Sequence, residues 1–471
     1  MKTYRIPGIY QEEISAIPPS VEEIETAIPA FVGYTSRAVR KETNDLIMVP
    51  VKIGSMREFE AFYGFPYENE LLMKVSADSS NKFMLTGCEE QELKYLLYYS
   101  IRIYFENGGG PCYVISVDTF SNPQQVVLKR LFGSRHFGLL DGLNTLTGVQ
   151  EVTLIVIPEA VKLAAEDYSL LVKAVLSHCD SLGNRFAIFD LFDGDKCTPD
   201  LNQNRSLFGN KYLNWGSAYF PFIRTKMTHH VSCDGHNVVV EYEGEKVPLG
   251  FLRSKNFLLY KFVRKVLNNR FVILPPSGAV AGVYVTTDKT RGVWKSPANI
   301  KLNRVVQPVV TIDNQLYDMF NAGPESRKSI NNIKSFEGKG TLVLGSRTLA
   351  MNDNDGKYIP VNRFKVMVLE SLKQSTSWVI FANNDSATWT KIRLIIENYL
   401  TLKWQEGALA GLYPQSSFYV KCGLGETMTE QDILEGKTSI EIGLAMIRPF
   451  EFSVLSFTHQ SKISVGSLQI A

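Results

Sequence analysis

The side chains best suited to metal chemistry gather in one short stretch, HHVSCDGH, at residues 229–236. Imidazole and thiolate groups bind zinc in a tetrahedron, and structural zinc sites usually draw their four ligands from two separated pairs. No second pair follows at a distance, and the stretch adjoins an expected hairpin. The pattern therefore favours a polar loop over a metal centre. The four ligand candidates are His229, His230, Cys233 and His236.

Three aspartates lie at or just after the end of FAIFDL (186–191), an apolar run that is typical of a buried strand. Functional carboxylates are common at the carboxyl ends of strands in α/β folds. The spacing does not match a calcium-binding loop, and the downstream glutamate of such a loop is missing. Because aspartate is frequent in turns, we expect a solvated turn here. The three residues are Asp190, Asp193 and Asp195.

The motifs that bind nucleotides or activate a serine are missing. Gly338, Gly340 and Gly345 precede an expected strand instead of a helix, so they do not match the dinucleotide-binding pattern. No phosphate loop ending in Gly-Lys-Ser/Thr occurs, and Ser277-Gly278 is not part of a GxSxG elbow. The sequence therefore predicts no catalytic residue, no cofactor and no metal, and it argues against an enzyme.

The composition indicates a folded protein with more than one core. A chain of 471 residues exceeds a typical domain, and 45% hydrophobic and 21% charged residues are ordinary for globular proteins. The net charge of +2 gives no support for nucleic-acid binding through bulk charge. No apolar run is long enough to span a membrane, and the N-terminal segment lacks the apolar core of a signal peptide. We therefore expect no membrane insertion and a start in the cytoplasm.

Apolar strands alternate with helical patterns through the first 300 residues, which predicts an α/β layer with a partly parallel sheet. Three stretches interrupt this order: 66–86 is polar and is expected to be a surface loop, 192–255 is hard to assign, and 275–299 is expected to be a loop or extended. Helices are predicted at 55–63, 89–107, 168–178 and 257–268, strands at 26–34, 112–117, 152–158, 186–191 and 219–225, and a hairpin at 238–249 that turns at Glu243-Gly244.

A compact α+β unit is predicted at residues 378–457. Its first residues are typical of a short buried strand, and apolar residues at 389–402 then recur at helical spacing. Ser386 is the candidate N-cap, and Gly407 ends the helix. Short alternating or β-branched runs at 418–420, 440–442 and 450–454 predict strands.

Both ends of the chain have strand-like segments that no neighbour in the sequence completes. Prolines near the start prevent a helix there, and apolar residues alternate with polar ones near the end. A terminal strand pairs back on its own domain or adds to the sheet edge of another chain, and the sequence leaves both options open. The strand-like residues are Tyr4, Ile6, Phe452, Val454, Ile463 and Val465.

With these motifs in order, the chain resembles the sheath proteins of contractile injection systems: phage tails, tailocins and extracellular phage-tail-like particles. The matching segments span nearly the whole length, whereas 66–86 and 192–255 fit the family pattern poorly. The segments are PGIYQEE (7–13), TAIPAFVGYT (26–35), NGGGPCYVISV (107–117), VTLIVIPEA (152–160), GVWKSPAN (292–299), INNIKSFEGKGTLVLGSRTL (330–349), LTLKWQEGALAG (400–411), FYVKCG (418–423), MTEQDILEGK (428–437) and IEIGLAMIRPFEF (440–452).

The resemblance implies an α/β and α+β multidomain fold, with a C-terminal α+β sheath domain, an outer α/β domain and extended strand-forming arms. The implied divisions are an N-terminal arm (1–20), an outer α/β domain (21–303) with insertions near 66–86 and 192–255, a C-terminal tube-facing domain (304–449) to which part of 21–35 can also contribute, and a C-terminal arm (450–471).

It also implies a structural subunit that polymerises as stacked hexameric rings around an inner tube and contracts to drive the tube through a target envelope. The implied partners are other sheath subunits or paralogues, the inner tube protein, and baseplate and terminal cap proteins, without nucleic acid. Assembly would take place in the cytoplasm, before the subunit becomes part of a virion or of a particle released by lysis. A non-contractile structural or adaptor subunit of the same particle and an α/β enzyme with an unrecognised site are the alternatives.

Two groups of residues are implicated by this resemblance. In the family, the arms add strands to the C-terminal domains of neighbours. For this chain we add the hypothesis that basic side chains on the long helix meet an acidic tube surface. An ordinary solvated helix face is the alternative for these basic residues. The arm candidates are Tyr4, Ile6, Ile9, Tyr10, Phe452, Val454, Ile463 and Val465, and the tube-facing candidates are Lys391, Arg393 and Lys403.

Overall fold

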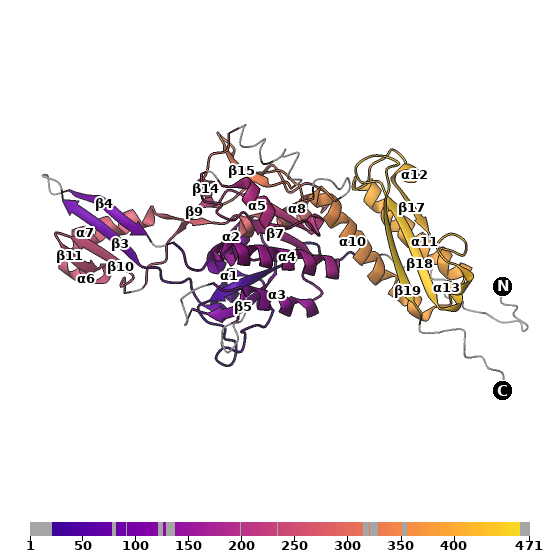
Figure 1. The fold of residues 1–471 in the computed structure, drawn as a ribbon, viewed down its shortest axis with the longest axis horizontal. Helices are drawn as coiled ribbons and strands as arrows, with labels where there is room; N and C mark the ends of the chain where they lie inside the picture. Colours follow the sequence, from indigo (N-terminus) through magenta and orange to yellow (C-terminus); the bar gives the residue numbers. More distant parts are fainter. Residues whose placement is uncertain are drawn as a thin grey trace, which may run out of the picture. The chain divides into compact units, whose positions relative to one another are not determined.

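The computed structural model forms two compact units (Figure 1). The larger unit comprises residues 25–364, and the smaller unit comprises the described residues up to Ile24 and from Lys365 onward. Residues 304–364, which the sequence assigns to the C-terminal domain, thus lie in the larger unit. The structure describes residues 21–77, 82–90, 92–120, 126–128, 137–197, 199–232, 234–313, 320, 328–350 and 356–461.

A nine-stranded sheet forms the centre of the larger unit. Its strands, in spatial order, are β13 (Ile300–Lys301), β16 (Gly340–Leu344), β15 (Asn331–Phe336), β8 (Gly216–Phe220), β7 (Phe186–Asp190), β6 (Leu154–Val156), β1 (Pro29–Thr35), β5 (Cys112–Thr119) and β2 (Val51–Ile53). The strands from β15 to β5 pair in parallel, and the strands outside them pair antiparallel. The predicted α/β layer with a partly parallel sheet is therefore confirmed.

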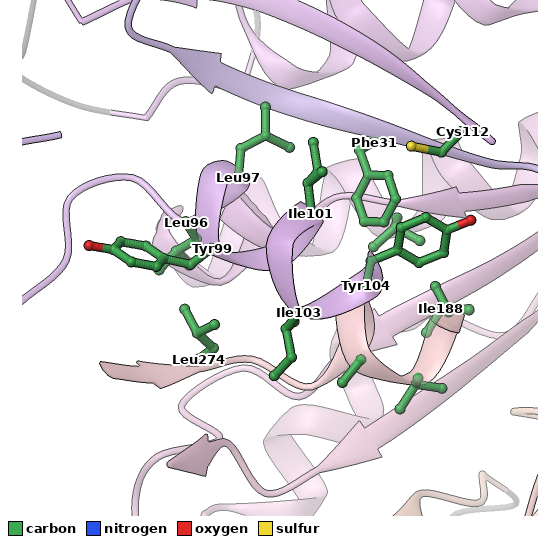
Figure 2. Close-up of a cluster of buried hydrophobic side chains, with 14 of the residues drawn as sticks. Phe31, Leu96, Leu97, Tyr99, Ile101, Ile103, Tyr104, Cys112, Ile188 and Leu274 are labelled. Atoms are coloured by element: carbon green, nitrogen blue, oxygen red, sulfur yellow. The ribbon is translucent and has the colours of Figure 1, made fainter. Parts of the chain in front are cut away.

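Helices cover both faces of this sheet, and each face has its own apolar core. Phe31 of β1 packs in one core with α2 (Leu97–Glu106) and α8 (Ser277–Arg291), whereas Ala30 and Val32 pack in the other with α3 (Leu139–Thr145) and α4 (Ala165–Leu182). A parallel strand between two helical layers is buried on both sides, which explains why all seven residues of β1 are buried. Figure 2 shows the first core, where the rings of Phe31 and Tyr104 meet edge to face at 5.2 Å.

The helix α8 shows that the prediction of a loop or extended segment at 275–299 is wrong. The small residues that suggested a loop let α8 pack closely on α2. A Cβ added at Gly278 would lie 2.5 Å from the Ser100 carbonyl oxygen, and one at Gly282 would lie 2.7 Å from that of Tyr104. Glycine lowers helix propensity by about 1 kcal/mol, so tertiary packing determines the conformation of this segment.

Gly282→Ala is expected to lower the free energy of unfolding by about 1–3 kcal/mol, because a methyl group here forces two helix backbones apart in a close-packed core. Denaturant unfolding measures the loss. Gly148→Ala is the matched control, since nothing lies within 4 Å of its added Cβ, and it should change stability by less than about 0.5 kcal/mol. Equal losses in the two variants would contradict the packing argument.

Parts of the two stretches that fit the family pattern poorly fold together. Strands β11 (Glu245–Pro248), β10 (Val238–Tyr242), β3 (Leu71–Ala77) and β4 (Phe83–Glu90) form a four-stranded sheet, with β3 parallel to β10. We call this sheet, with α6 (Leu249–Lys255) and α7 (Phe257–Asn268), the accessory sheet; it has an apolar core of its own. The expected surface loop at 66–86 is therefore wrong, whereas the hairpin at Glu243-Gly244 and the helix at 257–268 are confirmed.

The remaining elements of the larger unit are short. The run at 219–225, predicted as one strand, is divided between β8 and β9 (Ile223–Thr228). β9 lies between β12 (Phe271–Leu274) and β14 (Val305–Pro308) in an antiparallel three-stranded sheet. The other elements are α1 (Met56–Tyr63), α5 (Leu201–Leu207), η1 (Leu146–Gly148), η2 (Pro158–Lys162) and η3 (Leu213–Trp215).

The smaller unit contains the predicted long helix, α11 (Ser386–Gln405), but its N-cap is Asp385, not Ser386. The Asp385 side chain accepts a hydrogen bond from the Thr388 N–H at 2.9 Å. The expected buried strand before it is wrong, because residues Ser377–Phe381 form a 3-10 turn, η4. The other elements are the C-terminal part of α10 (Ile359–Ser375), α12 (Pro414–Ser417), α13 (Glu430–Leu434), and the strands β17 (Phe418–Lys421), β18 (Lys437–Leu444) and β19 (Ser453–Gln460).

Candidate assembly surface

The stretch 229–236 does not converge on a metal site. Among the residues that the structure describes, which omit Cys233, no three His, Cys, Asp or Glu side chains are placed to share an ion. Two of the histidines approach Glu68 instead: the distances from Nε2 to the carboxylate are 3.9 Å for His230 and 3.3 Å for His236. These are polar contacts of a loop.

Asp190 lies in the core, so the expectation of a solvated turn is wrong for this residue. Its two carboxylate oxygens accept hydrogen bonds from the backbone N–H and the hydroxyl of Ser277, at 2.7 and 2.5 Å. Ser277 begins α8, and the first N–H groups of a helix need acceptors from outside the helix. Asp190 is therefore a helix cap. Asp193 and Asp195 do lie in the turn that follows β7.

Glu159, which the sequence analysis does not single out, has the same role for α2. One carboxylate oxygen accepts from the Tyr34 N–H at 2.9 Å, and the other accepts from the N–H groups of Leu96 and Leu97 at 3.0 and 3.2 Å. A charged residue directly after the apolar run VTLIVIP was the available signal. Both buried carboxyl groups cap helices, and Glu159 also accepts from the backbone of β1, so they serve the fold.

Asp190→Asn is expected to stabilise the protein at alkaline pH. Burial raises the pKa of Asp190 to about 7, from an ordinary value of 3.8. The unfolded chain therefore loses this proton first, and rising pH favours the unfolded state between about pH 4 and 7. An asparagine oxygen still accepts from the Ser277 N–H, and the asparagine amide N–H donates to the Ser277 hydroxyl oxygen, without this penalty. The variant should therefore match the native chain near pH 4 and exceed its unfolding free energy by up to about 4 kcal/mol at pH 8.

Unfolding curves at both pH values check this, with Asp193→Asn as the control. Asp193 lies in the turn and pairs with Lys196 at 2.6 Å, so its substitution should show no such trend. An advantage of the Asp190→Asn variant over the native chain that does not grow between pH 4 and pH 8 would mean that folding does not raise the pKa of Asp190. Burial also raises the pKa of Glu159 to about 7, so native stability should decline over the same range.

The smaller unit is built around an antiparallel sheet in the order β17-β18-β19. Ile440 of β18 faces Phe457 of β19, and Ile442 faces Leu455 on one side and Val420 on the other. These residues are buried or half-buried and form the inner face of the sheet. Alternation of side chains then places the intervening residues on an outer face.

The outer face of this sheet is polar with one aromatic patch. Glu441 accepts a hydrogen bond from the Tyr419 hydroxyl at 3.0 Å and pairs with Lys421 at 3.2 Å. The Tyr419 ring covers Gly443, where an added Cβ would lie 2.0 Å from the ring, and it meets Phe452 edge to face at 5.1 Å. A sheet with only one buried face leaves its other face for solvent or for a partner.

Both edges of this sheet are open within the described residues, since no further strand pairs with β17 or β19 there. The hydrogen bond from the Ser461 N–H to the Gly436 carbonyl shows which residues of β19 direct their backbone N–H and C=O groups toward β18. By antiparallel alternation, the backbone groups of Val454, Ser456 and Thr458 point to the open edge. An open edge presents unpaired donors and acceptors to another strand.

The predicted arm residues fall partly on this sheet. Val454 lies in β19 on the outer face and is 57% exposed, and Phe452 immediately precedes β19. The segment after Pro449 thus pairs back on its own unit through residue 460, which was one of the two options that the sequence left open. The remaining arm candidates, Tyr4, Ile6, Ile9, Tyr10, Ile463 and Val465, lie outside the described residues.

The first described residues are bound to the smaller unit. The Glu22 N–H donates to the Ser375 hydroxyl at 3.2 Å, and the Ile24 N–H donates to that of Ser371 at 3.1 Å. Between them, Glu23 forms an ion pair with Lys403. The chain therefore begins its described course on the unit that has the open sheet edges.

The three basic candidates on α11 differ in their surroundings. Lys403 is only 5% exposed and lies between Glu23 and Glu406, 2.6 Å from the latter, so its charge is largely satisfied within the unit. Lys391 is exposed and lies over the Trp378 ring at 4.6 Å, and Arg393 is half-buried and 3.7 Å from Glu426. Lys391 thus presents the least compensated charge of the three.

Exposed apolar side chains are concentrated on the smaller unit. It holds ten of the 22 large apolar side chains that are exposed in the described chain, although it has only about a quarter of the described residues. Leu412 and Tyr413, which are 84% and 68% exposed, lie next to α12. Phe450, 71% exposed, is tied to the same helix by a hydrogen bond from its N–H to the Ser416 carbonyl. Exposed apolar surface of this kind is typical of protein–protein contacts.

The comparisons with known proteins point to one class. No family model matches the chain. A tail sheath protein of Vibrio phage KVP40 is 24% identical over 144 residues, which are 30% of this chain and 21% of that protein's length. The match thus spans about a fifth of the length of this curated relative.

Solved structures match over nearly the full length. A chain of the anti-feeding prophage baseplate, six-fold symmetrised, is 27% identical, with a TM-score of 0.62 over 97% of this chain and 100% of that one. A chain of the sheath complex of the extracellular contractile injection system PVC, in the contracted state, is 26% identical, with a TM-score of 0.62 over 98% and 99%.

The fold and the comparisons define the class as that of structural proteins of contractile particles. More narrowly, the resemblance of this chain to contractile tail sheath proteins is confirmed. These relatives are structural proteins, not enzymes. In the described part of this chain, no helix has the length and apolar character needed to cross a membrane.

Proposed function

We propose that this chain is the sheath subunit of a contractile particle, which polymerises as stacked hexameric rings around an inner tube and contracts to drive that tube through a target envelope. The observation that carries the proposal is the three-stranded sheet of the smaller unit, whose two edges are open in the described residues. Similarity over nearly the whole length to a chain of a contracted sheath complex and to a chain of a baseplate supports it.

Strand addition would connect the subunits. Residues 1–20 and 462–471 would each extend to a neighbour and add a strand to β17 or β19. Main-chain hydrogen bonds along such a strand do not depend on side-chain identity, and a link of this kind would let rings rotate and slide while they stay connected. Contacts of this head-to-tail kind do not close on themselves, so they produce a helical assembly of open length.

Contraction would then be a change between two packings of the same linked subunits. The extended form would be held by a kinetic barrier, and repacking of subunit faces would release the stored free energy. The exposed apolar side chains around Leu412, Tyr413 and Phe450 are the best candidates for faces that exchange partners. In this proposal the linked sheet persists while these faces repack.

Further partners follow from the particle that this subunit would build. Lys391, with Arg393 beside it, would face an acidic surface of the inner tube, and charge reversal at both positions should weaken tube binding while leaving polymerisation intact. Baseplate and terminal cap proteins would contact the end rings, and sheath paralogues could share the lattice. Assembly would take place in the cytoplasm before release of the particle.

Electron microscopy of the purified chain tests the proposal. The full chain should form hollow, ridged tubes, and a chain that lacks residues 1–20 should form none while it keeps the circular dichroism of the full chain. Separate particles of uniform size from both chains would refute a self-assembling sheath. They would instead support a non-contractile adaptor subunit of the same particle, which the exposed apolar surface of the smaller unit also fits.

A further inference from the structure

The accessory sheet carries a concentration of positive charge that the assembly role does not use. Residues 249–270, which include α6 and α7, contain six basic residues and no acidic one. The whole chain has 50 basic and 48 acidic side chains. Without these six, the chain has 44 basic against 48 acidic side chains, so this short segment alone makes the net charge positive.

Three of these six charges lie on the solvent side of α7. Leu259, Val263 and Leu267 are buried in the core of the accessory sheet. The opposite side of the helix is exposed, and it presents three basic side chains together with Phe257 and Leu258, which are 51% and 71% exposed. Phe251 of α6 is 68% exposed. We call this surface the α6–α7 face: Phe251, Arg253, Lys255, Phe257, Leu258, Lys261, Arg264 and Lys265.

The positive charges on this face are not neutralised by neighbours. Exposed helix faces usually carry charges of both signs, but among the described residues only Lys255 of this face forms an ion pair, with Glu245 at 2.6 Å. Lys261 lies over the Phe257 ring at 4.7 Å. Basic and apolar groups therefore share one surface, and the basic groups have charge available for a partner.

A cavity of about 380 Å³ opens beside this face. Arg253 and Arg264 line it, together with the hydroxyl-bearing residues Ser232 and Ser254. Guanidinium groups bind phosphate oxygens in pairs, whereas the hydroxyls of Ser232 and Ser254 already donate within the chain, to Asn237 Oδ1 and to the Phe251 carbonyl. Asp234 also lines the cavity, so the net positive charge comes from the two arginines. The cavity has the size and the donors to receive a phosphate-bearing headgroup.

We infer that the α6–α7 face binds the surface of an anionic lipid membrane. Three exposed apolar side chains among basic ones fit the boundary between headgroups and acyl chains, where each type of side chain finds its preferred surroundings. A second copy of this face would repel it, and a nucleic acid would leave Phe251, Phe257 and Leu258 in water. Binding would be peripheral. It would bring the particle to a membrane independently of contraction.

Vesicle flotation of the full chain tests this inference, because flotation separates bound protein from protein polymers. The chain should float with vesicles of phosphatidylcholine and phosphatidylglycerol and bind vesicles of phosphatidylcholine alone at least tenfold more weakly. Raising the salt from about 0.1 to 1 M, which shortens the screening length about threefold, should release most of it. Absence of flotation with the anionic vesicles would overturn the inference.

Two variants and a matched control separate charge from apolar contact. Lys261→Glu/Arg264→Glu/Lys265→Glu should bind anionic vesicles at least tenfold more weakly. Phe257→Ser/Leu258→Ser keeps the charge and should bind severalfold more weakly. Lys301→Glu/Lys334→Glu/Lys339→Glu makes the same change in net charge away from the face and should stay within twofold of native binding. A loss in this control equal to that of the first variant would overturn the inference.

Binding to soluble polyanions distinguishes a membrane from an acidic macromolecule. Heparin and single-stranded DNA present negative charge without an acyl layer, so they should bind more weakly than the anionic vesicles. Equal or tighter binding to these polymers, unaffected by Phe257→Ser/Leu258→Ser, would overturn the lipid inference in favour of a polyanion partner. Thermal unfolding curves that match the native curve confirm that each variant is folded.

Discussion

Ser456→Pro is expected to abolish the formation of tubes and to leave the subunit folded. The backbone N–H of Ser456 points to the open edge of β19, away from β18. Proline removes this N–H and is tolerated on edge strands when the missing donor faces outward. An added strand would lose a hydrogen bond at its centre and would clash with the proline ring. Every subunit would carry the substitution, so every contact between subunits along the polymer would be weakened.

Two neighbouring substitutions make this test specific. Ser456→Ala removes the hydroxyl and keeps the N–H, so it should form tubes. Phe457→Pro removes a donor that faces β18 and a buried ring, so it should unfold the smaller unit. Electron microscopy measures tube formation, and circular dichroism measures folding. Normal tubes from a folded Ser456→Pro chain would show that the β19 edge is not used for assembly.

The sequence predicted secondary structure correctly where the local hydrophobic pattern and the packing in the folded protein favour the same conformation. The runs that became β1, β5, β6 and β7 are mainly apolar, as expected for parallel strands with helices on both faces. It misled at α8, because glycine and alanine indicate a loop unless a second helix packs against them. It also misled at η4, because a short apolar run has no period that separates a strand from a turn.

The strand pairing in the accessory sheet could not be predicted from local sequence patterns. β3 alternates buried and less buried residues as a strand should, but its parallel partner β10 is more than 150 residues away. Neither segment has a complete core by itself, so each looks irregular alone. Parts of the two stretches that fit the family pattern poorly thus form one structure, and this structure carries the α6–α7 face.

Charge roles could not be assigned from residue type alone. Asp190 and Lys403 both looked like solvated groups in the sequence, yet each is buried against partners far along the chain, Ser277 and Glu23 respectively. From the sequence, a terminal strand could be predicted, but not whether it pairs with its own domain or adds to the sheet of another chain. Which option applies depends on the register of β19 on β18, which is a tertiary property.

Arg363→Ala is expected to lower the free energy of unfolding of the larger unit by about 3–5 kcal/mol, because it leaves a buried carboxylate without its countercharge. Arg363 of α10 and Asp288 of α8 form a bidentate ion pair, in which two guanidinium N–H groups donate to the two carboxylate oxygens at 2.5 and 3.0 Å. Their side chains are only 5% and 6% exposed. Arg363 also donates to the Thr26 carbonyl at 2.8 Å and lies over the Tyr284 ring at 4.8 Å.

Denaturant unfolding measures this loss, and two further variants test its cause. Arg363→Met/Asp288→Leu removes both charges and should recover most of the stability, since an apolar pair avoids the cost of desolvating two ions. Lys52→Ala breaks an ion pair with Glu151 whose side chains are 42% and 56% exposed, and it should cost less than about 1 kcal/mol. If the double variant is no more stable than Arg363→Ala, the lost contacts to Thr26 and Tyr284 account for the effect, and the unpaired carboxylate does not.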